Sequence, residues 1–160
     1  MATPRLERAG SPRGFERLLF RAPIGLYRIG LGFVLGQRFL MLEHEGRHSH
    51  ETRRTVLEVV VNDADAAYVA AGWGAEAQWL KNIRANPSVV VYLGSRRFET
   101  VAEIVGPAAA GELMQRYAEE HPKTLVRLGG FMLDDPAGTA EEVASQLAAT
   151  IPMVRLPKSA

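Results

Sequence analysis

The chain has 160 residues, of which 47% are hydrophobic and 23% charged, a balance that is ordinary for one globular domain with a buried core. It contains no cysteine, which excludes disulfides, thiolate metal sites and cysteine nucleophiles and fits a reducing compartment. The net charge of +1 is unevenly spread, because residues 1–38 carry seven arginines against two glutamates while the remainder is acidic.

The N-terminal part divides into a polar arm and an apolar stretch. Residues 1–14 are broken by prolines and glycines, which predicts a flexible arm ahead of one domain over residues 15–160. The apolar residues 15–42 are interrupted by arginines and a proline, so we expect neither a transmembrane span nor a secretory signal.

Three arginines of this stretch, Arg17, Arg21 and Arg28, fall on one narrow arc of a helix. Two interpretations of residues 15–38 stay open: an amphipathic helix packed on the domain's own core, or a helix in contact with an anionic membrane surface. The expected location is therefore cytoplasmic, either free or peripheral to the inner membrane face. Nucleic acid is not an expected partner, because the body of the chain is acidic and offers no aromatic–basic platform.

The middle of the chain has the pattern of short strands in hairpin-like succession. Alternating and β-branched residues predict strands over residues 38–44, 53–61, 67–71, 88–93 and 96–105. One helix interrupts them over residues 76–85, and Asn86-Pro87 ends it.

Helices dominate the C-terminal part. Prolines at their starts predict helices over residues 107–119 and from 122 to about 128, and a glycine-bounded loop follows over residues 129–138. Thr139 and Glu142 form a capping-box pattern for a third helix, and an apolar strand closes the chain over residues 152–156. The whole succession predicts an α+β domain built on an antiparallel barrel or sheet.

Side chains capable of catalysis or metal binding are few. His44, His48 and His50 lie near glutamates, as in zinc, iron or nickel sites, but Gly46 breaks any regular face between them, so we predict loop histidines and no metal site. Ser49 lies between two histidines without a nucleophile-elbow motif. No catalytic residue is therefore assigned, and a cofactor is expected to supply the chemistry of an enzyme.

Two stretches suit an anion. Residues 46–54 combine a hydroxyl with several cations, which fits a phosphate or polycarboxylate, or else a solvated loop. In residues 68–87 a strand leads through Gly72 and Gly74 into a helix start, which fits a phosphate or else a plain turn.

Together these stretches resemble the deazaflavin-dependent nitroreductase family. That family has Gly-Arg-Lys/Arg-Ser-Gly-x-x-Arg, then a Ser/Gly-rich loop and Trp-Tyr-x-Asn-Leu-x-Ala-Asn-Pro. The corresponding segments here are residues 46–53 and 79–87. The resemblance implies a split β-barrel shared with flavin reductases. It also implies an oxidoreductase that transfers hydride from reduced coenzyme F420 to a small electron-poor acceptor of the quinone, nitroaromatic or enone type.

The resemblance also implies the coenzyme-binding residues. The first motif and its neighbouring arginine would hold the phosphate and oligoglutamate tail, and these residues are Arg47, His48, Ser49, Arg53 and Arg54. The glycine loop and helix start would hold the deazaflavin ring and phosphate, and these residues are Ala71, Gly72, Trp73, Gly74, Gln78 and Trp79.

Four positions depart from the family pattern: His48 replaces a lysine or arginine, His50 a glycine, Ala71 a serine and Leu80 a tyrosine. Because histidine enters positive φ less readily than glycine, we expect a reshaped loop at His50. The alternatives are FMN as the cofactor, or a non-catalytic protein that binds flavin, haem or lipid. A homodimer through a barrel edge or a glycine-striped N-terminal helix is a further expectation.

Overall fold

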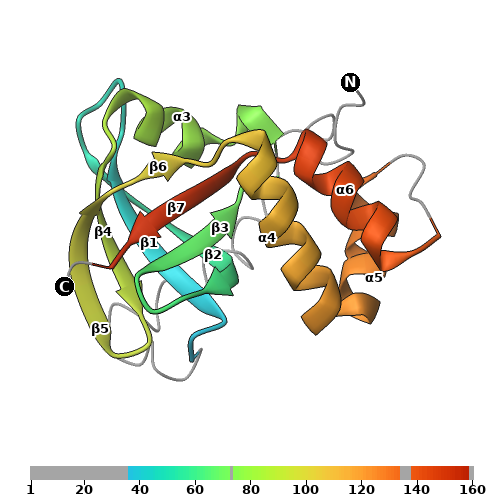
Figure 1. The fold of residues 1–160 in the computed structure, drawn as a ribbon. Coiled ribbons are helices and arrows are strands. Elements are labelled where there is room, and N and C mark those ends of the chain that lie inside the picture. Colours follow the sequence, from blue (N-terminus) through green and yellow to red (C-terminus); the bar gives the residue numbers. More distant parts are fainter. Residues whose placement is uncertain (1–35, 73, 134–137, 159–160) are drawn as a thin grey trace.

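A computed structural model describes residues 36–72, 74–133 and 138–158 (Figure 1). Seven antiparallel strands form one sheet in the order β5-β4-β1-β2-β3-β7-β6. Their bounds are β1 Phe39–Glu45, β2 Thr52–Asn62, β3 Ala66–Ala70, β4 Ser88–Leu93, β5 Arg96–Val101, β6 Glu103–Ile104 and β7 Met153–Pro157. The helices are η2 Gly74–Glu76, α3 Gln78–Ala85, α4 Pro107–Glu120, α5 Pro122–Met132 and α6 Ala140–Thr150.

The sheet closes on itself because its two edge strands follow each other in the chain. Only Ala102 separates β5 from β6, and its backbone N–H donates to the Pro87 carbonyl at 2.8 Å. The predicted strand 96–105 is thus two strands that lie on opposite edges of the sheet. This nearly closed barrel confirms the predicted α+β split-barrel fold.

Apolar side chains on the inner face of the strands fill the barrel, and α3 adds its apolar face to the same core. The helix contributes Trp79, Leu80 and Ile83, which pack with Leu40 and Leu42 of β1. The predicted helix 76–85 therefore exists as one 3₁₀ turn followed by α3. The packing of its apolar residues on the barrel core places α3 against the end of β1 that leads into residues 46–51.

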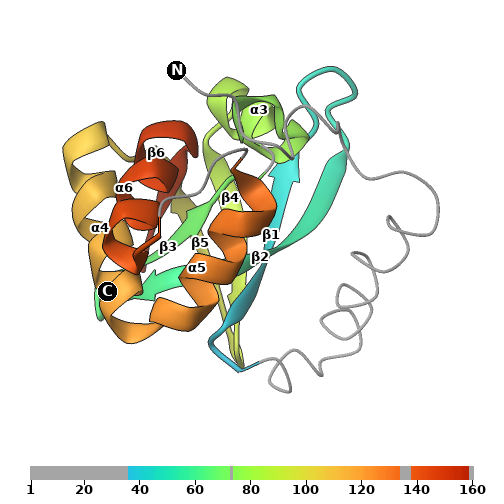
Figure 2. The same ribbon diagram turned by 90° about the vertical axis from the view of Figure 1, so that its right-hand side faces the viewer.

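A second core lies outside the barrel, where α4, α5 and α6 lie on one side of the sheet (Figure 2) and pack against residues of β2, β3 and β7. The capping box of Thr139 and Glu142 is confirmed at the start of α6. The predicted loop over residues 129–138 is wrong for residues 129–132, which are helical. A Cβ built at Gly129 would lie 2.5 Å from Val143 Cγ1, so this glycine is a helix–helix contact and not a terminator.

The expectations for residues 1–35 lie outside the described residues, including the arm and the arginine arc. Within the part of the chain that the structure describes, no helix is long and apolar enough to cross a membrane.

Candidate coenzyme site

The loop of residues 46–51, hereafter the arginine loop, connects β1 to β2 and is closed by its own backbone. The Gly46 N–H donates to the Glu51 carbonyl at 2.9 Å, and the His50 N–H donates to the Gly46 carbonyl at 2.8 Å. A Cβ at Gly46 would lie 2.7 Å from the Ser49 hydroxyl oxygen. A side chain at this position would therefore have to displace the Ser49 hydroxyl.

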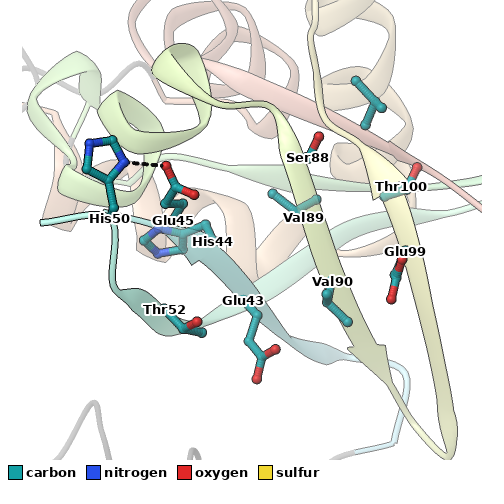
Figure 3. A pocket seen from close by; sticks show the side chains of 11 residues that line it. Glu43, His44, Glu45, His50, Thr52, Ser88, Val89, Val90, Glu99 and Thr100 are labelled. Carbon is teal, nitrogen blue, oxygen red and sulfur yellow. Dashed lines mark hydrogen bonds and ion pairs between the residues drawn. The ribbon is translucent and has the colours of Figure 1, made fainter. Parts of the chain in front are cut away.

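His50 adopts φ +56° in this loop, a conformation that glycine adopts without strain, and the reshaping relative to the family's loop stays a prediction. Histidine enters the left-handed region more often than most residues, at an energetic cost that glycine does not bear. The His50 ring also lies 2.8 Å from the Glu45 carboxylate, an exposed contact that contributes little to stability (Figure 3).

His50→Gly should consequently stabilise the protein by about 1 kcal/mol, because it removes the strain of positive φ at a small loss of contact energy. Urea denaturation of both proteins at pH 7.5 measures this gain. An unchanged or lower free energy of unfolding would contradict the strain argument.

Arg47 joins the arginine loop to α3. Its backbone N–H and its guanidinium Nη1 both donate to Asn82 Oδ1, at 3.2 and 2.9 Å, and Nη2 donates to Gln78 Oε1 at 3.0 Å. The two stretches that the sequence singled out are thus in direct contact. Both acceptors are neutral amide oxygens, so no carboxylate cancels the charge of Arg47 in these contacts.

A buried histidine lies behind Asn82. His44 and Asn82 are 6% and 7% exposed, and Asn82 Nδ2 lies 3.2 Å from His44 Nδ1. Burial lowers the pKa of His44 to about 4, opposed by a hydrogen bond to the Glu45 backbone and assisted by the Arg53 charge. His44 is therefore neutral at pH 7, although the sequence suggested a loop residue.

Stability should fall in acid because unfolded His44 binds a proton more readily than the folded form. With pKa values of 6.5 unfolded and about 4 folded, this loss begins as the pH falls through 6.5 and is complete below 4. Between pH 7 and 4.5 the native protein should lose about 2 kcal/mol more than His44→Asn. Urea denaturation at both pH values checks this, and equal losses would contradict it.

The other predicted cations of the loop region are placed differently. Arg53 opposes His44 in the β1–β2 ladder and lies on the same face, where it donates to Ser49 Oγ at 3.3 Å and pairs with Glu51 at 2.7 Å. Arg54 opposes Glu43 on the other face and pairs with it at 2.7 Å. His48 is exposed at the tip of the loop. Arg53 therefore contacts the arginine loop, and Arg54 is directed away from it.

The glycine loop is a tight turn before α3. Ala71 is fully buried, and its N–H donates to the Pro152 carbonyl at 2.8 Å. Gly74 adopts φ +68°, and its N–H donates to the Ala71 carbonyl at 2.7 Å. Gly72 is half-buried and Gln78 exposed, whereas Trp79 belongs to the barrel core at 8% exposed. Trp73 lies outside the described residues.

A pocket of about 580 Å³ lies beside this region, lined by residues of β1, β4 and β5 and by His50, and His44 is among the lining residues (Figure 3). Its lining is acidic at Glu43, Glu45 and Glu99, and none of the predicted coenzyme-binding residues lines it. A negatively charged tail is unfavourable there. Among the described residues no three acidic or histidine side chains are grouped to hold a metal ion.

Tyr117, the tyrosine of α4, lies far from the arginine loop. Its hydroxyl donates to Glu58 Oε1 at 3.4 Å, and burial together with the Glu58 charge raises its pKa to about 12. Glu58 is five residues beyond Arg53 on β2, which corresponds to about 17 Å at the usual rise of a strand.

Sequence reasoning did not assign His44 and Asn82 to the site. The sequence feature that could have indicated this pair is the asparagine at position 82. It lies between Trp79 and Ile83 on the apolar face of α3, where its buried amide requires a hydrogen-bond partner.

Comparisons with known proteins identify the family of the chain and similar folds. A family model described as F420H(2)-dependent quinone reductase matches residues 25–128. A comparison with curated proteins gave no match. A solved F420-H2 dependent reductase is 17% identical, with a TM-score of 0.53, and the alignment covers 76% of this chain and 95% of that one.

Two further solved structures share the fold. One, described as a domain-swapped dimer, is 18% identical with a TM-score of 0.55, covering 88% of this chain and 92% of that one. The other is a conserved hypothetical protein from Mycobacterium tuberculosis, 22% identical with a TM-score of 0.54, covering 81% of this chain and 77% of that one.

Proposed function

The chain belongs to the F420H2-dependent quinone reductase family, and from this premise we propose that its arginine loop and the start of α3 bind the deazaflavin coenzyme. The family uses coenzyme F420, so the protein is an oxidoreductase that transfers hydride from F420H2 to a small acceptor such as a quinone. When bound, the coenzyme supplies the hydride, and the protein's residues supply binding, orientation and exclusion of water.

One observation carries the proposed site: the guanidinium of Arg47 is held between the loop and α3 by amide oxygens alone. A cation that is fixed and not neutralised suits the phosphate or carboxylates of the coenzyme tail. Arg53, which donates to Ser49 Oγ and is paired with Glu51, would extend this anion site together with Ser49 and with His48 at the tip of the loop. Arg54 has a smaller part because it pairs with Glu43.

The ring and the phosphate nearest to it would lie at the glycine loop, against Gly72, Trp73, Gly74 and Gln78, whereas Ala71 and Trp79 belong to the barrel core and would support the loop from behind. No side chain caps the start of α3, so its first backbone N–H groups are available to a phosphate. The Gly74 N–H donates to the Ala71 carbonyl within the turn, so Gly74 contributes to the shape of the loop and not to phosphate binding.

Titration with oxidised F420, followed by tryptophan fluorescence, tests the proposed site. We expect saturation at micromolar concentrations and none with FMN, and no saturable binding at tens of micromolar would contradict the proposal. Oxidation of F420H2 with a panel of quinones, nitroaromatics and enones then identifies the acceptor. Arg96→Ala, on the distant β4–β5 hairpin, is the control variant.

We further propose that the protein forms a homodimer, supported by the similar fold solved as a domain-swapped dimer. Light scattering measures its mass in solution.

Cytoplasmic location and membrane contact through residues 15–38 also stay predictions. Co-sedimentation with anionic liposomes, compared between the native protein and a variant lacking Arg17, Arg21 and Arg28, tests the membrane contact.

A further inference from the structure

We infer that His44 and Asn82 are positioning residues, a buried relay that holds the guanidinium of Arg47 in place for an anionic group of the coenzyme. This inference rests on the proposed coenzyme site. It assigns a role to two buried polar residues that neither contact the solvent freely nor belong to the hydrophobic core of the barrel.

The hydrogen bonds fix the orientation of every group in the relay. Both groups of Arg47 that approach Asn82 Oδ1 are donors, so the amide oxygen must face Arg47. The amide nitrogen then faces His44 Nδ1 at 3.2 Å, and an amide nitrogen can only donate. His44 Nδ1 is therefore the acceptor, and the ring proton lies on Nε2.

The relay works only while His44 is neutral. A protonated ring would direct an N–H at the amide N–H of Asn82 and turn the amide away from Arg47. Burial is the main factor against the protonated ring, and the Arg53 charge opposite it on β2 assists, whereas a hydrogen bond to the Glu45 backbone and the nearby carboxylates of Glu43 and Glu45 act in the other direction. No carboxylate takes part in the hydrogen bonds that link the three residues, so the Arg47 charge stays available for an anion.

Fixing Arg47 in advance matters because an arginine side chain loses much conformational entropy when it is immobilised. Because the relay already immobilises Arg47 in the folded protein, this loss of entropy does not weaken coenzyme binding. Loss of the relay should therefore weaken coenzyme binding, and this weakening should occur only when Arg47 is present.

A double-mutant cycle tests this dependence. His44→Leu should weaken the binding of oxidised F420 about tenfold in the native background and leave it unchanged in an Arg47→Ala background. His44→Asn, which offers an acceptor near the position of Nδ1, should restore most of the affinity. Leu42→Val, a core change on the same face of β1, controls for general destabilisation and should not alter the affinity.

Equal weakening by His44→Leu in both backgrounds, or none in the native one, would overturn the relay. If Arg47→Ala itself leaves the affinity unchanged, both the relay and the proposed role of Arg47 fail. If Arg47→Ala weakens binding and His44→Leu does not, the relay alone fails.

A spectroscopic measurement on the native protein tests the relay without relying on the folding of any variant. Nitrogen-15 NMR of the histidine rings at pH 7 should show His44 with an unprotonated Nδ1 and a proton on Nε2. A proton on Nδ1 would reverse the orientation of Asn82, remove the acceptor of Arg47 and overturn the relay.

Discussion

Arg47→Ala should weaken the binding of oxidised F420 about a hundredfold. A charge-assisted hydrogen bond in a partly buried site is worth up to about 3 kcal/mol, which corresponds to roughly that factor. Arg47→Lys should recover only part of the loss, because an ammonium cannot reproduce the planar fork that contacts Asn82 and Gln78 together. Fluorescence titration gives the dissociation constants.

The matched comparison is Arg54→Ala, which removes the same charge nearby. Its guanidinium is paired with Glu43 on the opposite face of the β1–β2 ladder, so we expect a change of less than about threefold. Equal losses for both variants, abolished by high salt, would show that long-range attraction governs binding instead of the contact geometry of Arg47.

Gly129→Ala should destabilise the protein by about 2 kcal/mol, although alanine is the better helix former. The added Cβ would lie 2.5 Å from Val143 Cγ1, and Val143 is fully buried in α6. A β-branched side chain in a helix has one strongly preferred rotamer, so Val143 cannot easily turn away.

The neighbouring glycine supplies the control. A Cβ at Gly130 meets nothing within 4 Å, so Gly130→Ala should stabilise α5 by about 0.5–1 kcal/mol. Urea denaturation of the two variants should therefore give changes of opposite sign. If both variants are more stable than the native protein, α5 and α6 do not pack as closely as described.

The sequence predicted those parts of the fold that are governed by local pattern. Strand alternation, the capping box at Thr139 and the proline-started helices each specify an element within a few neighbouring residues, and these elements are confirmed. The glycine pair at 129–130 failed because local propensity favours a loop, whereas a tertiary contact with Val143 decides in favour of a helix.

The candidate site also has contacts that the sequence predicted and contacts that depend on tertiary packing. The contact between the arginine loop and α3 followed from the two family motifs, but the His44–Asn82 pair joins residues 38 positions apart and depends on how α3 packs against the barrel. The separation of Arg53 from Arg54 could have been predicted, because adjacent residues of a strand point to opposite faces.

The junction at Ala102 bears on how copies of the protein can associate. An open sheet presents two rows of unpaired backbone groups, to which another chain can add a strand. Here the chain passes from one edge strand to the other across a single residue, and the edge strand β6 has two residues, so it offers only a short row for such an addition. If two copies pair through a sheet edge, the six-residue strand β5 is therefore the longer of the two edges.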